Sequence, residues 1–246
     1  MSDTTTTRRN FLTGGALVSA AFLAGCQSVP PIGRSPSPAP VAPARPSFIS
    51  APPADVNNFA SAYASISDGG FQIPAVPWEK IDRRFLRQEV ANNTGVGSGK
   101  VVVETSQHHL YFTMPGGRAM RYGVGLGREG FEWAGTGDVR RKAEWPKWHP
   151  PAEMIDREPK LEIYRTTYNK ATDTWEGGME PGLLNPLGAR AHYIFQGQND
   201  TLYRLHGSPE WWSIGKSVSS GCVRLINQDV IDLYNRVPEG TEIIVR

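Results

Sequence analysis

Alternating apolar and polar residues predict strands over most of the C-terminal half of the chain. Residues 100–104 and 108–113 are rich in β-branched and aromatic side chains, a composition typical of strands. Pro115-Gly116-Gly117 is a turn signal, and residues 118–126 alternate as a third strand. Further strands are predicted within residues 185–195, 201–205 and 241–245. The strand at 201–205 would deliver His206 at its end.

One segment near the C-terminus has a helical period instead. Between residues 228 and 236 the apolar positions are 230, 231, 233 and 234, which line one side of a helix. Asn227 is the predicted N-cap of this helix, and Pro238 ends it. The pattern therefore predicts a mainly β protein, an antiparallel sandwich or barrel with one short helix near the C-terminus.

Three stretches have no single clear period. Residues 81–90 are compatible with either one amphipathic helix or one strand, and the glycines between 125 and 137 predict short strands and loops. Residues 152–180 mix charges with Trp175 and a glycine pair. We interpret that last stretch as a long excursion that could cover a site.

The N-terminus is predicted to be an export signal over residues 1–25 rather than part of the fold. Arg8-Arg9 lies in a stretch that resembles a twin-arginine motif, and the apolar run 11–25 is shorter than the roughly 20 residues of a membrane span. The run leads into Cys26 through Leu-Ala-Gly, which resembles a lipobox and implies a lipid on Cys26. An ordinary export signal is the alternative. Both place the mature protein outside the cytoplasm, in the periplasm or cell envelope.

Composition divides the remainder of the chain. Residues 26–54 hold nine prolines among alanine and serine and should form an extended tether, while residues 55–98 form an N-terminal extension of unclear role. The 246 residues contain 26 glycines and 20 prolines, which favours a turn-rich β fold. A net charge of +2, with no Lys/Arg run longer than three residues, argues against a nucleic-acid partner.

The two cysteines have different predicted fates. In an oxidising compartment a Cys26–Cys222 disulfide is the plainest expectation. Lipidation would consume Cys26, however, and leave Cys222 as a thiol in an exported protein. Such a thiol is unusual unless the protein uses it.

A histidine near Cys222 in the sequence suggests what that use is. His206-Gly207 precedes Gly221-Cys222 by a short, glycine-containing segment. A thiol becomes a strong nucleophile when an imidazole takes its proton, so His206 and Cys222 are the candidate base and nucleophile.

The other four histidines do not suggest a metal site. His108 and His109 are adjacent on a predicted strand and would face opposite sides. His149 and His192 lack cysteine or acidic partners at ligand spacing. We therefore expect neither a metal nor a cofactor.

Residues 99–246 resemble the L,D-transpeptidase (YkuD-like) catalytic domain of bacterial cell-wall enzymes. The resemblance covers most of the chain beyond the tether, and its parts occur in the expected order. They are Asn185–Arg190, His206-Gly207, Ser213–Gly215, Ser219–Arg224, Asn227, Asp229, Leu233-Tyr234 and residues 237–241.

The resemblance implies a mechanism and a substrate. Cys222 would attack a peptidoglycan stem tetrapeptide and form a thioester with loss of D-alanine, and His206 would be the base. The backbone carbonyl of Gly207 would orient the imidazole, and the backbone N–H groups of Gly221 and Cys222 would stabilise the oxyanion. The acceptor could be a second stem peptide, an outer-membrane or wall-attached protein, or water. We expect a monomer.

One departure from the family pattern concerns the residue two before the nucleophile. Many members have Ser-His-Gly-Cys, whereas this chain has serine at both 219 and 220. That substitution leaves His206 as the one imidazole of the motif and makes both serines candidate substrate contacts. It also keeps open a wall-binding lipoprotein without catalysis.

Two further residues are candidates for binding substrate. Arg224 could meet a substrate carboxylate, or it could be a structural arginine between strand and helix. Trp212 could wall the substrate groove, or it could pack within its loop.

Overall fold

The computed structural model describes residues 58–127, 134–219 and 221–246, without the side chain of Ser219. By its contacts the chain divides into Met1–Ala44 and Arg45–Arg246, and every described residue belongs to the second unit. The predicted export signal, Cys26 and the tether lie outside the described residues, as does Ser220.

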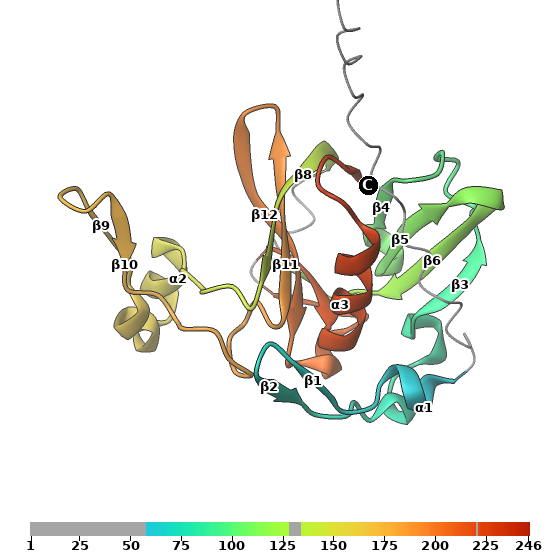
Figure 1. The fold of residues 1–246 in the computed structure, drawn as a ribbon, viewed down its shortest axis with the longest axis horizontal. Coiled ribbons are helices and arrows are strands. Elements are labelled where there is room, and N and C mark those ends of the chain that lie inside the picture. Colours follow the sequence, from blue (N-terminus) through green and yellow to red (C-terminus); the bar gives the residue numbers. More distant parts are fainter. Residues whose placement is uncertain (1–57, 128–133, 220) are drawn as a thin grey trace, which may run out of the picture. The chain divides into compact units, whose positions relative to one another are not determined.

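A nine-stranded sheet forms the framework of this unit (Figure 1). Its strands are paired in the order β14-β12-β11-β8-β15-β4-β5-β6-β3. Only the pairs β12–β14 and β15–β4 are parallel. The bounds are β3 Gln88–Ala91, β4 Val101–Glu104, β5 His109–Met114, β6 Arg118–Gly123, β8 Gly135–Glu144, β11 Arg190–Gln196, β12 Asn199–Ser208, β14 Val223–Ile226 and β15 Glu242–Val245.

Shorter elements surround this sheet. Two hairpins and one parallel pair complete the strands: β1 Ile66–Asp68 with β2 Phe71–Ile73, β9 Thr167–Asn169 with β10 Thr174–Glu176, and β7 Leu126–Gly127 with β13 Ser217–Ser219. The α-helices are α1 Phe59–Ala62, α2 Ala152–Arg157 and α3 Asn227–Arg236. The 3-10 turns are η1 Trp78–Lys80, η2 Arg83–Phe85, η3 Thr105–Gln107, η4 Pro115–Gly117, η6 Pro159–Tyr164 and η7 Trp211–Ser213. None of the helices in the described ranges is long and apolar enough to cross a membrane.

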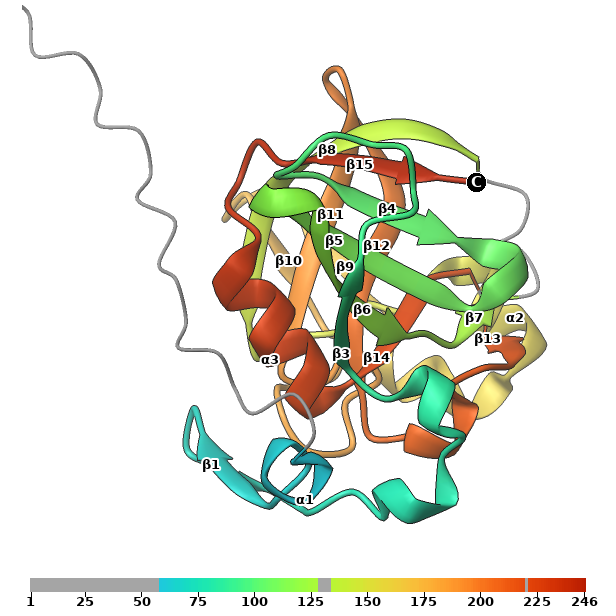
Figure 2. The same cartoon turned by 90° about the vertical axis from the view of Figure 1, so that its right-hand side faces the viewer.

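The sheet bends around one apolar core. In Figure 2 the strands β11 and β12 run across the direction of β4, β5 and β6, and α3 lies beside them. Buried side chains from these strands, such as Leu110, Tyr122 and Leu205, meet Val230 and Leu233 of α3 in this core. The mainly β, mostly antiparallel fold with one C-terminal helix is therefore confirmed.

Several local expectations were wrong. Asn227 is the first residue of α3, not its cap, because its side chain is engaged elsewhere. His108 has φ +54° and ends η3 outside the strand, so the opposite-face argument for His108 and His109 does not hold. The glycine-rich stretch holds the short strand β7 as predicted, but Gly135 and Gly137 belong to the ten-residue β8. Residues 81–90 hold a 3-10 turn and the start of β3 rather than one helix or one strand.

The N-terminal extension packs against the nine-stranded sheet and α3. Phe59, Tyr63 and Phe85 form a second apolar cluster with Ile214 and Ile226 from the C-terminal part of the chain. The extension also supplies β3, the edge strand beside β6. Residues 58–98 are thus an integral part of this packed unit.

A buried polar cluster joins the extension to α3. The Tyr63 hydroxyl donates to Asp229 Oδ2 at 3.1 Å, and Arg87 Nη1 lies 3.5 Å from Asp232 Oδ1 and 3.8 Å from Asp229 Oδ1. Asp229 is fully buried, and that burial raises its pKa to about 7 despite the nearby Arg87.

Asp229 should give folding a pH dependence that Asp229→Asn removes. An unfolded aspartate has a pKa of about 3.9, so between about pH 4 and 7 the folded state holds a proton that the unfolded chain has lost. Protonated Asp229 therefore contributes its full stabilisation below about pH 4. This contribution to the unfolding free energy decreases between about pH 4 and 7, by on the order of 4 kcal/mol in total, and is lost once the pH has passed the folded pKa of about 7. Urea unfolding of both proteins from pH 4.5 to 7.5 measures the difference.

The exposed Asp138, which is paired with Arg140, provides the matched control. Asp138→Asn should keep the wild-type dependence of the unfolding free energy on pH. An unchanged dependence in Asp229→Asn would show that Asp229 is already ionised in the folded protein at pH 4.5.

Candidate active site

Two neighbouring parallel strands bring the candidate base and nucleophile to the same side of the sheet. β12 and β14 pair with His206 opposite Arg224, and Cys222 comes directly before β14. Because side chains alternate along a strand, Cys222 and Arg224 face the same side as His206. The sheet register thus explains how residues separated along the chain share one site.

His206 and Cys222 line a single pocket of about 330 Å³. Much of the pocket wall comes from residues 152–180, the excursion that was predicted to cover a site. The other lining residues are Trp148, Met154, Glu158, Lys160, Leu161, Tyr164, Met179, Pro186, Leu187, Glu210 and Arg224. The pocket therefore combines an apolar wall with a few polar groups, the composition of small-molecule and peptide sites.

The imidazole of His206 is buried and held by its own neighbour. Nδ1 lies 2.6 Å from the backbone oxygen of Gly207, and a carbonyl can only accept, so Nδ1 carries the hydrogen of the neutral ring. Burial lowers the pKa of His206 to about 4, and the carbonyls of Gly207 and Pro186 oppose this shift. At neutral pH the ring is uncharged, and Nε2 has the lone pair that a base needs.

The thiol of Cys222 is also uncharged at neutral pH. Burial raises the pKa of this thiol, whereas the Arg204 backbone N–H and the guanidinium groups of Arg204 and Arg224 oppose the increase. Its sulfur lies 3.9 Å from the backbone oxygen of Leu202. The resting site is therefore a thiol and an imidazole rather than an ion pair.

Close backbone packing fixes the carbonyl that holds His206. A Cβ on Gly207 would lie 2.3 Å from Asn227 Oδ1, and one on Gly188, where φ is +60°, would lie 2.6 Å from the Gly207 carbonyl carbon. Asn227 Oδ1 accepts the backbone N–H of Ala189 at 2.9 Å. Asn227 therefore positions the backbone beside His206. It was predicted to cap α3 instead, because the contact with Ala189 joins segments that are far apart in the sequence.

Asn185 was also given no role of its own from the sequence. Its side-chain nitrogen donates to three backbone oxygens, those of Pro146, Met179 and Glu180, at 3.1 to 3.2 Å. Met179 belongs to the pocket wall. The fully buried Asn185 therefore fixes the end of the excursion beside the pocket.

Gly207→Ala should destabilise the protein and slow any reaction that depends on His206. The added methyl group has no space against Asn227 and Val230, and overpacking of this kind costs about 1–3 kcal/mol. Urea unfolding measures the loss of stability. Gly182 has open space around it, so Gly182→Ala is the control and should be neutral. Equal stability of the two variants would contradict the close packing.

The remaining candidates differ in where the structure places them. Arg224 Nη1 lies 2.7 Å from Glu210 Oε2, and both residues line the pocket. Gly221 has φ +124° with open space beside it, so its backbone conformation is what requires glycine. Trp212 does not line this pocket. It is 54% exposed and lines a separate hollow with Trp211 and Lys80.

The backbone of Ser219 lies in β13, and its side chain is not described. Within the described residues no three His, Cys, Asp or Glu side chains are grouped so that they could hold a metal ion.

A cysteine and a neutral histidine thus line one pocket. The family model of the L,D-transpeptidase catalytic domain (YkuD) matches residues 98–245, and the chain belongs to this family. The match includes both His206 and Cys222.

Among curated proteins the chain is similar to two enzymes of Escherichia coli K12. It is 32% identical over 148 residues to Probable L,D-transpeptidase ErfK/SrfK and 31% identical over 148 residues to Probable L,D-transpeptidase YbiS. These matches cover 58% of this chain and 42% and 43% of those proteins. The chain thus matches less than half the length of these curated relatives.

Solved structures are also similar to this chain. A Brucella melitensis protein titled a probable carnitine operon oxidoreductase is 41% identical, with 69% of this chain and 99% of that chain covered and a TM-score of 0.44. An L,D-transpeptidase from Mycobacterium smegmatis is 19% identical over 59% of this chain and 57% of that chain, with a TM-score of 0.41.

Proposed function

We propose that this protein is a cysteine-dependent L,D-transpeptidase acting on peptidoglycan stem peptides. The observation that carries the proposal is the pocket shared by His206 and Cys222, in which the Gly207 carbonyl fixes the imidazole. Membership of the family supplies the reaction class, and the site supplies the two groups that this reaction needs.

Acylation begins with the neutral pair. His206 Nε2 takes the thiol proton as the sulfur attacks the carbonyl carbon of the third stem residue. The tetrahedral oxyanion accepts hydrogen bonds from the backbone N–H groups of Gly221 and Cys222. The carbon–nitrogen bond to D-alanine then breaks, His206 returns the proton to the leaving amine, and a thioester remains on Cys222.

Deacylation repeats these steps with a different nucleophile. An acceptor amine attacks the thioester carbonyl and gives its proton to His206, and the carbon–sulfur bond breaks to restore the thiol. With a stem-peptide amine the product is a 3→3 cross-link. With a protein amine it is a wall-attached protein, and with water it is a free tripeptide.

Arg224 could bind a carboxylate of the stem peptide. Its guanidinium lines the pocket and is already paired with Glu210, so a substrate carboxylate would bind beside that pair or displace Glu210. A purely structural role of the Arg224–Glu210 pair is the alternative. The activity of Arg224→Lys distinguishes the binding role from the structural role, because lysine keeps the charge but loses the planar guanidinium.

Product analysis tests the choice of acceptor. Purified protein is incubated with disaccharide-tetrapeptide, and the products are separated by mass. A 3→3 dimer that is absent from Cys222→Ala supports transpeptidation. Tripeptide without dimer would support the hydrolase alternative and refute cross-linking of this substrate.

We also propose that the protein is exported and lipid-anchored through Cys26, on the evidence of the signal-like residues 1–25 and the lipobox resemblance. Labelled palmitate should be incorporated by the full chain and lost in Cys26→Ala. Equal labelling of both would refute the anchor.

A further inference from the structure

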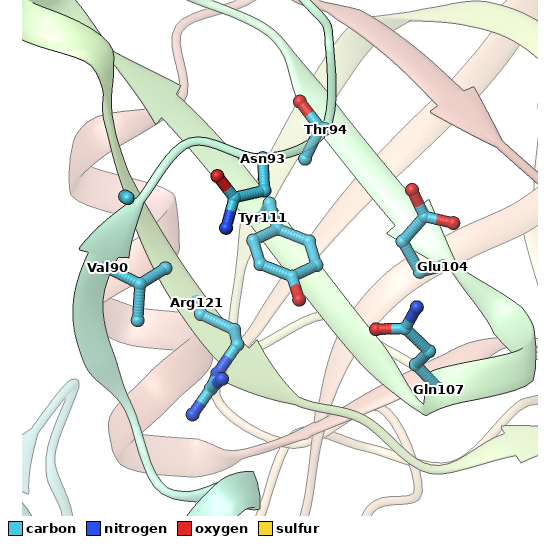
Figure 3. Close-up of a pocket in the computed structure, with 8 residues that line it drawn as sticks. Val90, Asn93, Thr94, Glu104, Gln107, Tyr111 and Arg121 are labelled. Atoms are coloured by element: carbon cyan, nitrogen blue, oxygen red, sulfur yellow. The ribbon is translucent and has the colours of Figure 1, made fainter.

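A second pocket lies over strands β3, β4, β5 and β6, near the opposite end of the strand order from β12 and β14. It has a volume of about 420 Å³ and shares no lining residue with the catalytic pocket. β14 is one edge of the nine-stranded sheet and β3 is the other. The lining residues are Val90, Ala91, Asn93, Thr94, Glu104, Gln107, Tyr111 and Arg121 (Figure 3).

Arg121 is the cation of this pocket, and part of its guanidinium lacks a partner. Among the described residues, the buried Arg121 Nε has no hydrogen-bond acceptor. On the same strand, by contrast, Arg118 Nε donates to Glu89 at 2.9 Å. Leaving a buried donor unsatisfied costs free energy, and more for a charged group. Because Nε itself is closed to solvent in this conformation, a ligand oxygen would satisfy it once the Arg121 side chain turns toward the pocket.

Polar but uncharged groups surround Arg121. Tyr111 is its direct cross-strand neighbour, so both side chains lie on one face of the sheet. In Figure 3 the Tyr111 ring lies in the middle of the pocket, with Asn93 and Arg121 on one side and Gln107 and Glu104 on the other. The hydroxyl and the two side-chain amides can each donate and accept hydrogen bonds, as a peptide group requires.

The charges of the pocket favour a ligand with one negative charge. Glu104 is the carboxylate of the wall, and Arg246 Nη2 lies 2.8 Å from its Oε1. Arg246 is therefore engaged by Glu104 and by the Thr94 carbonyl, so Arg121 is the cation left for a ligand. A phosphate with nearly two charges would have one such cation and a carboxylate nearby, whereas a carboxylate needs a single guanidinium.

We propose that this pocket binds the terminal carboxylate of a peptide. Arg121 and Tyr111 receive the carboxylate, Asn93 and Gln107 meet the preceding peptide group, and Val90 and Ala91 offer a small apolar wall for a side chain of methyl size. The site is independent of acyl transfer at Cys222, because the two pockets have no residue in common.

The test is a titration of the isotope-labelled full chain with N-acetyl-D-alanyl-D-alanine, followed by NMR. The side-chain amide signals of Asn93 and Gln107 report binding, and the Nε–H signal of Arg121 reports the contact itself. We expect saturable shifts with the acid and none with the corresponding C-terminal amide. The L,L-dipeptide acid distinguishes a stem-peptide terminus from an ordinary protein terminus as the source of the carboxylate.

Matched arginine variants show whether Arg121 carries the binding. Arg121→Gln should weaken it about tenfold or more, since a hydrogen bond to a charged group contributes at least that much. Arg118→Gln should bind like the wild type. Equal shifts with the amide, unchanged affinity in Arg121→Gln, or stronger binding of inorganic phosphate would overturn the proposal.

Three further measurements keep the result interpretable. Urea unfolding checks that Arg121→Gln is folded, and Tyr111→Phe, which loses only the hydroxyl, should also bind the acid more weakly if the first variant is unstable. Acylation of Cys222 should be unchanged in Arg121→Gln. Failure of the titration would therefore leave the proposed catalytic function standing, and absence of acylation would leave the titration valid.

Discussion

Cys222→Ala should form no covalent adduct with a carbapenem, whereas the wild-type chain should gain the mass of one molecule. A carbapenem presents a strained amide carbonyl that a nucleophilic thiol can attack, and the resulting thioester survives intact-mass measurement. The effect is a complete loss, because alanine supplies no nucleophile. It should be accompanied by near wild-type stability, since Cys222 is only partly buried and the substitution only shortens its side chain.

Two controls make this result specific. Cys26→Ala should still gain one adduct, because the other cysteine is the nucleophile. Cys222→Ser should react far more slowly, since a hydroxyl is a weaker nucleophile than a thiol and His206 would have to ionise a less acidic group. A folded wild-type protein that gains no adduct would contradict catalysis and favour the alternative of a wall-binding lipoprotein.

Local sequence patterns were sufficient to predict several of the strands, α3 and the pairing of His206 with Cys222 in one pocket. The alternation in residues 118–126 and the helical period in 228–236 follow from burial of one face, and β6 and α3 occupy most of those ranges. The short spacing of His206 and Cys222 already suggested a shared site, although β12 continues past His206 to Ser208 rather than ending at the histidine. These features depend on neighbours along the chain.

Contacts between distant segments could not be predicted in the same way. Asn227 has the sequence signature of a cap, yet its oxygen is used by the backbone of Ala189 from another element. The left-handed backbone of His108 has no periodic signal at all. Trp212 lies between His206 and Cys222 along the chain but lines a different hollow. Sequence proximity was a poor guide there.

The pocket around Arg121 could not be predicted from the sequence either. Its lining comes from β3, β4, β5, β6 and the turns between them, and no two of the charged residues there form a recognisable motif. Only the register that sets Tyr111 opposite Arg121 brings them together. Motif analysis finds sites that reuse a known spacing, whereas a pocket assembled by strand pairing needs the structure.

His206→Ala should fold normally but acylate about 10²–10⁴-fold more slowly, which is the usual contribution of a general base. The wild-type rate should be nearly constant from about pH 5.5 to 8. Burial lowers the pKa of His206 to about 4, so the base is already unprotonated across this range, and burial raises the pKa of Cys222, so the thiol keeps its proton until His206 removes it.

The pH profile of the variant should differ in shape as well as in height. Without His206 the reaction needs thiolate formed by ionisation in water, so the residual rate should rise about tenfold per pH unit up to the raised pKa of the thiol. Rates of carbapenem adduct formation from pH 5.5 to 8 measure both profiles. His149→Gln replaces a surface histidine that contacts Thr166 and should behave as the wild type. An unchanged rate in His206→Ala would refute the role of His206 as base. A rate of the unmodified protein that rises through pH 6.5 would refute the neutral resting pair, because the imidazole would then titrate at its ordinary value.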